Sequence, residues 1–136
     1  MEKRNFYIGC PIWSYKEWVG SLFPPRTPPS GFLRLYSRKL STVEGNTTFY
    51  AVPGAETIAR WRAETPPEFR FCPKIPRTIS HSPALEATRE PTLAFVARMQ
   101  GLGERLGPIF LQLPPQFGPA HLKQLATWLS FWPDDT

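Results

Sequence analysis

Short apolar runs alternate with helical patterns along the whole chain. The runs cover residues 6–10, 41–44, 69–72 and 109–113. Each is followed by a segment whose apolar residues recur every three or four positions, a pattern typical of an amphipathic helix. The predicted helices run from about Gly31 to Arg38, Ala55 to Glu64, Pro91 to Leu102, and from about Leu122 to Trp132.

The alternation predicts an α/β fold. Strand and helix in strict succession favour βα units with parallel strands and right-handed crossovers. We expect a single domain over residues 1–136, with the strands in the order 1-2-3-4 in a curved sheet. Four such units equal half of a TIM-type (β/α)8 barrel, and a small open α/β sheet fits them too. In both architectures the functional side chains gather at the carboxyl ends of the strands.

The second predicted strand ends in an abruptly polar stretch, VEGNTTFY, at residues 43–50. The chain has no aspartate before Asp134, and Glu44 is the one glutamate at the carboxyl end of a predicted strand. A carboxylate placed there suits proton transfer to or from a ligand. The alternative is an ion pair with Lys74 on the neighbouring strand, which would satisfy both charges without catalysis. Asn46 and Thr48 follow Glu44 and are expected to contact a ligand.

A basic cluster follows the third predicted strand. Lys74, Arg77 and His81 lie in one loop, and such a cluster is suited to a phosphate or carboxylate group. A solvated surface loop is the competing interpretation. His81 is also a candidate acid–base residue, although a single loop histidine is often only a surface residue. Gln112, at the end of the fourth strand, completes the predicted polar rim.

Aromatic residues follow the first two strands. Four of them, Trp13, Tyr15, Phe49 and Tyr50, could stack on a sugar or base. Aromatic loop residues can instead cover the core of a barrel, so both ligand stacking and core covering remain open for these residues.

Composition narrows the classes of function. The net charge of +5 is scattered along the 136 residues, and this argues against nucleic-acid binding, which needs basic residues clustered on one face. No apolar run approaches the roughly 20 residues of a membrane span. Two cysteines without a CxxC pair favour a reduced, cytoplasmic protein. The sequence has no metal-binding motif, dinucleotide fingerprint, Walker loop or GxSxG elbow, so it points to no particular cofactor.

Four ordered blocks carry a resemblance to a known family. They read IGCPIWSYKEWVGSLFPP, TVEGNTTFY followed by VPGAETIARWRAETPPEFRF, KIPRTISH, and IFLQLPPQF. Together they resemble the YecE-like proteins, a family known as domain of unknown function 72, from about Phe6 to Phe131. Ile12 departs from the glycine that the family commonly has before the tryptophan.

The resemblance implies a TIM-barrel fold, of which this chain would form only a part. YecE-like proteins have more than about 200 residues, as a full barrel needs, so the chain is expected to be truncated after its fourth βα unit. We therefore expect it to need a second half-barrel, from a copy or a separate chain, or else to be an inactive remnant.

The function expected of the intact fold is enzymatic. A small anionic substrate, such as a phosphorylated sugar or nucleoside, fits the candidate residues. A non-catalytic ligand-binding or scaffold protein is the alternative.

Overall fold

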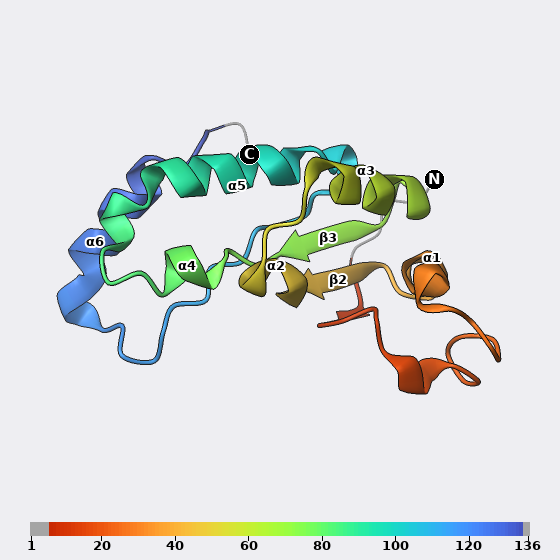
Figure 1. The fold of residues 1–136 in the computed structure, drawn as a ribbon. Helices are drawn as coiled ribbons and strands as arrows, with labels where there is room; N and C mark the ends of the chain where they lie inside the picture. The colour runs from red at the N-terminus through yellow and green to blue at the C-terminus, as the bar shows by residue number, and fades with distance from the viewer. Residues whose placement is uncertain (1–5, 135–136) are drawn as a thin grey trace.

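Three short parallel strands form an open sheet at the centre of the protein. The computed structural model describes residues 6–134. Its strands lie in the order β1-β2-β3, and Val43 of β2 pairs with Cys10 on one side and Phe71 on the other. Figure 1 shows β2 and β3 side by side and pointing the same way. The strands are β1 (Gly9–Cys10), β2 (Thr42–Gly45) and β3 (Arg70–Pro73). The predicted α/β class, parallel pairing and order of the first three strands are therefore confirmed.

The fourth predicted strand does not form a regular ladder. Residues 109–113 lie next to β3, but only an isolated parallel bridge joins Phe110 to Lys74. Phe110 N–H donates to the carbonyl of Pro73 at 2.8 Å, and Ile75 N–H donates to the carbonyl of Phe110 at 2.8 Å. Prolines explain the difference, because Pro73, Pro108 and the Pro-Pro pair at 114–115 have no N–H to donate. The prediction of a regular fourth strand was wrong, although the segment occupies the fourth position.

The four longer helices were predicted, with α3 at the expected bounds. Two short helices, α2 and α4, were missed because four or five residues are too few to show a helical period. No helix within residues 6–134 is both long enough and apolar enough to cross a bilayer. The helices are α1 (Phe32–Lys39), α2 (Asn46–Tyr50), α3 (Ala55–Glu64), α4 (Arg77–Ser80), α5 (Arg89–Gln100) and α6 (Leu122–Ser130).

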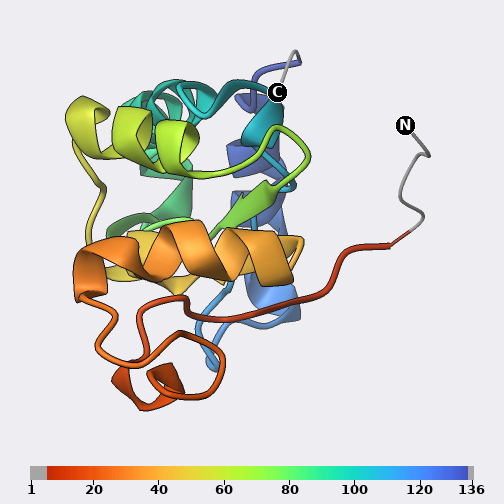
Figure 2. The ribbon, with the colours of Figure 1, turned by 90° about the vertical axis from the view of Figure 1, so that its right-hand side faces the viewer.

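The main core lies between the sheet and the helices. α1, α3 and α5 lie next to one another in that order (Figure 2). Val43 and Phe71 are buried, and the Phe71 ring stacks on Trp61 of α3 at 5.7 Å. Because strand residues alternate between faces, Glu44 and Cys72 point to the other face, where both are only partly buried. One face of the sheet is thus packed, and the other carries the candidate polar residues.

Tyr36 of α1 forms hydrogen bonds to the first two strands. Its ring is fully buried, and its hydroxyl accepts the N–H of Cys10 at 2.6 Å and donates to the carbonyl of Thr42 at 2.8 Å. Burial raises the pKa of the Tyr36 phenol to about 12. The hydroxyl therefore remains a proton donor at neutral pH and holds β1 in register with β2.

Candidate functional site at the carboxyl ends of the strands

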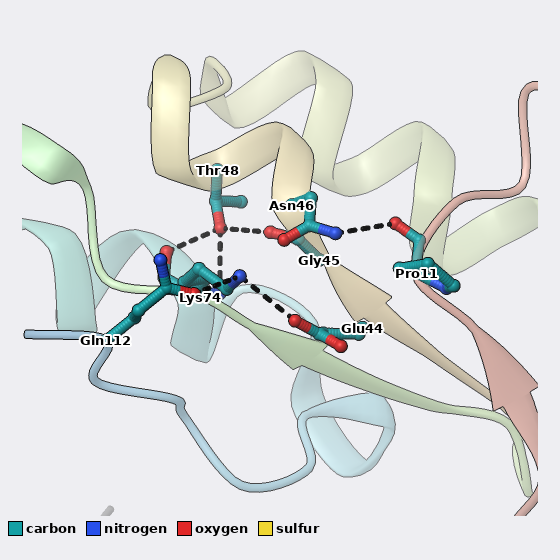
Figure 3. A network of polar contacts seen from close by, with 7 residues as sticks. All are labelled: Pro11, Glu44, Gly45, Asn46, Thr48, Lys74 and Gln112. Carbon is teal, nitrogen blue, oxygen red and sulfur yellow. Dashed lines mark hydrogen bonds and ion pairs between the residues drawn. The ribbon is translucent and has the colours of Figure 1, made fainter.

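Lys74 is the centre of a polar cluster at the carboxyl ends of the strands. It directly follows β3, and its side chain is only 7% exposed. Its Nζ lies 3.0 Å from Oε1 of Glu44, at the end of β2, and donates to Oε1 of Gln112 at 3.0 Å (Figure 3). The structure therefore brings together three predicted site residues that are far apart in the sequence.

Two aromatic rings complete the surroundings of the Lys74 ammonium. Phe49 and Phe110 each place their ring centroid 5.4 Å from Nζ, within the range of cation–π attraction. Removing an ammonium from water costs several kcal/mol unless a counter-charge and hydrogen bonds compensate for it. Glu44 supplies that charge, and its side chain remains 44% exposed. The cluster thus joins a buried cation to a carboxylate that solvent or a ligand can reach.

Thr48 positions Lys74 from the backbone side. Its hydroxyl accepts the N–H of Lys74 at 2.9 Å and lies 2.6 Å from the Lys74 carbonyl and 2.8 Å from the Gly45 carbonyl. Thr48 is 1% exposed. The expectation of direct ligand contact is corrected here, because a buried hydroxyl already held by the backbone cannot reach a ligand.

The strands β2 and β3 approach closely at Gly45, the residue just before α2. A Cβ on Gly45 would lie 2.9 Å from the Cα of Pro73, so a larger residue would force the strands apart. The chain passes from Gly45 directly into α2. Asn46, the first residue of α2, donates from Nδ2 to the carbonyl of Pro11 at 3.1 Å (Figure 3). This bond ties the loop after β1 to the same rim.

His81 lies next to the cluster, separated from Lys74 by Phe49. The rings of His81 and Phe49 meet edge to face, with centroids 5.4 Å apart. Nδ1 of His81 lies 2.8 Å from the hydroxyl of Ser80. Arg77 begins α4 and is exposed, and Tyr50 is 71% exposed with its ring edge against Phe49.

Trp13 and Tyr15 do not cover the cluster. Trp13 packs edge-on against Trp61 at 5.0 Å, on the helix side of the sheet. Tyr15 packs against Trp18 at 5.3 Å and donates its hydroxyl to Glu17. Trp13 is partly buried against the core and away from Lys74, so its stacking on a ligand stays a prediction.

Of the two rings beside Lys74, Phe49 was among the aromatic residues expected to stack on a ligand, whereas Phe110 was not a predicted site residue. Phe110 is two residues before Gln112, and strand alternation places them on one face, so that spacing could have revealed it. Phe49 follows Thr48 in the short helix that the sequence did not reveal. Within residues 6–134, no three His, Cys, Asp or Glu side chains gather closely enough to hold a metal ion.

Comparison with known proteins places the chain in a family. The pattern of the family "Protein of unknown function DUF72" matches residues 7–136, and the chain belongs to this family. The UPF0759 protein YecE of Escherichia coli K12 is 42% identical over 129 residues, which cover 95% of this chain and 45% of YecE. The UPF0759 protein YunF of Bacillus subtilis is 35% identical over 68 residues, or 50% of this chain and 23% of YunF.

Two solved structures of the family have a similar fold. A DUF72 protein from Thermotoga maritima superimposes with a TM-score of 0.72 at 22% identity, covering 93% of this chain and 52% of that one. Another from Enterococcus faecalis gives a TM-score of 0.66 at 28% identity, covering 79% of this chain and 46% of that one. The chain thus spans about half the length of YecE and of both solved proteins.

Thr48→Val should destabilise the protein because it leaves the buried polar groups around Lys74 poorly paired. We expect the free energy of unfolding in urea to fall by about 1–3 kcal/mol. Thr48→Ser, which keeps the hydroxyl, should lose much less. Thr47→Val is the matched control, since Thr47 is the exposed neighbour in α2. Equal stability of Thr48→Val and Thr47→Val would show that the hydroxyl does not hold Lys74.

Proposed function

We propose that the intact fold is an enzyme that performs acid–base chemistry on a small anionic polar substrate, best represented by a phosphorylated sugar or nucleoside. The observation that carries the proposal is the pairing of buried Lys74 with the half-exposed carboxylate of Glu44 at the carboxyl ends of the strands. Parallel α/β folds place their active sites at this edge.

The geometry supports a division of roles. Glu44 accepts a proton from the substrate, because its carboxylate is accessible and lies at the rim. Lys74 stabilises the negative charge that this proton transfer leaves on a neighbouring substrate oxygen. Gln112 orients the ammonium through its 3.0 Å hydrogen bond. Arg77 attracts the anionic group of the substrate, and His81 serves as a second proton donor or acceptor.

The rival proposal is a ligand-binding or scaffold protein in which Glu44 and Lys74 only neutralise each other. The 3.0 Å ion pair is compatible with this, because Glu44 and Gln112 already satisfy two of the three N–H donors of the ammonium. The third alternative is nucleic-acid binding through the basic residues Lys74 and Arg77. Binding of oligonucleotides that weakens steeply with salt would support it.

Ligand-induced thermal shifts separate the enzyme from its rivals. Phosphorylated sugars or nucleotides from a metabolite panel should raise the melting temperature of the wild-type protein. Lys74→Met should abolish the shift, because it removes the ammonium and keeps the length of the side chain. Glu44→Gln should still bind, but its turnover of any substrate found should fall about 10²–10⁴-fold, the usual contribution of a general base.

Glu56→Gln is the control for this experiment, since Glu56 is an exposed glutamate at the start of α3. It should match the wild type in both binding and turnover. Wild-type turnover in Glu44→Gln would disprove the acid–base role. Binding without any turnover would favour the non-catalytic rival.

The proposal includes the completion of the barrel. We infer that these βα units are one half of a (β/α)8 barrel and that a second half covers the open edges. Ile8 and Phe110 lie at opposite edges of the sheet and are 59% and 48% exposed. Unpaired edges beside apolar side chains favour pairing with another chain. The similar structures, about twice as long, support the same inference.

The 136-residue chain should therefore self-associate or aggregate in solution. Sedimentation velocity should show species larger than a monomer, and thermal unfolding should be broad. Ile8→Lys places a charge at the edge next to β1 and should reduce the association. A wild-type monomer with a sharp two-state melt would contradict the half-barrel and favour a complete small α/β domain.

A further inference from the structure

A pocket lies beyond His81, on the side toward which β2 and β3 point. Its volume is about 300 Å³, and it is lined by residues of two segments, 80–85 and 114–124. Figure 1 shows α4 and the first turn of α6 on this side of the sheet. The chain has two histidines, and both His81 and His121 line the pocket.

The lining of this pocket combines polar and apolar groups and contains no permanently charged side chain. It includes the amide side chains of Gln116 and Gln124, together with apolar walls from Pro114 and Leu85. None of its lining residues is Asp, Glu, Lys or Arg. Phosphate groups are usually held by Arg, Lys or clustered backbone N–H groups. The lining therefore suits an uncharged group with hydrogen-bonding edges.

An imidazole and a phenyl ring form one wall of the pocket. The rings of Phe117 and His121 have centroids 5.2 Å apart and are tilted by 35°. Gly118 N–H donates to Nδ1 of His121 at 3.2 Å, so in the neutral ring Nε2 carries the proton. His121 thus offers a hydrogen-bond donor next to an aromatic surface, a combination that suits a flat heterocycle.

The pocket and the Lys74 cluster lie on either side of the Phe49 ring. The Phe49 ring lies 5.4 Å from the Lys74 ammonium and 5.4 Å from the His81 ring. A ligand that spans both places would have its anionic end near Lys74 and Arg77 and its uncharged end among the glutamines. A nucleoside monophosphate has this distribution of charge.

We propose that the His81–His121 pocket binds the base of a nucleotide substrate. Glutamine amides can pair with the donor and acceptor atoms on the edge of a base, and aromatic rings stack on its face. The proposal rests on the proposed function, because the phosphate is assigned to the Lys74 cluster. It deepens that function by selecting nucleotides over sugar phosphates.

Binding measurements on the full chain test this assignment. Calorimetry would compare ribose 5-phosphate with the four ribonucleoside 5′-monophosphates and the corresponding nucleosides. At least one nucleotide should bind about 10-fold tighter than ribose 5-phosphate, the effect expected of one stacked base. Gln124→Ala and His121→Ala should remove this advantage and leave the affinity for ribose 5-phosphate unchanged.

Two further variants control for folding and position. His121→Asn keeps an acceptor for the Gly118 N–H but removes the ring, so it should lose the advantage even if His121→Ala fails to fold. Lys123→Ala changes an exposed neighbour outside the pocket lining and should bind like the wild type.

Each outcome separates this inference from the proposed function. Equal affinity for ribose 5-phosphate and every nucleotide would overturn the base pocket and leave the anionic substrate in place. Nucleosides that bind as well as nucleotides, with no loss in Lys74→Met, would support the pocket and overturn the phosphate role of the rim. Absence of binding by every compound would overturn both.

Discussion

The burial of one ammonium group, that of Lys74, constrains the arrangement of residues at the carboxyl ends of the strands, which we call the rim. Lys74 is 7% exposed at the side chain, and a cation removed from water needs a counter-charge and hydrogen-bond acceptors. Glu44 and Gln112 supply them at 3.0 Å each, and two phenyl rings close the sides. Because these partners come from β2, from α2 and from the segment beside β3, satisfying the ammonium fixes how the units meet.

The same constraint connects the fold to the proposed chemistry. Thr48 holds the backbone of Lys74, and Gly45 lets the two strands approach closely enough for the ion pair. The carboxylate of Glu44 is left partly open while its partner is enclosed. A fixed cation beside an accessible base is an arrangement that can take a proton from a substrate and stabilise the charge that remains.

The sequence predicted the rim better than its surroundings. Glu44, Lys74 and Gln112 could be placed on one edge because the carboxyl ends of parallel strands meet there, whatever the length of the connections. Trp13 could not be placed, since a loop aromatic gains as much from packing on Trp61 as from facing a ligand. The sequence pattern did not reveal that the fourth strand is irregular. This irregularity is seen only in the hydrogen bonds of residues 107–115, where prolines lack the N–H that a regular ladder needs.

A double-mutant cycle between Glu44 and Lys74 tests the central claim most directly. The free energy of unfolding would be measured for the wild type, Glu44→Gln, Lys74→Met and the double variant. If the rim depends on compensating the buried ammonium, Glu44→Gln should be costly alone and nearly neutral once Lys74 is Met, with a coupling of about 0.5–3 kcal/mol. Additive losses, with coupling below about 0.3 kcal/mol, would contradict that dependence.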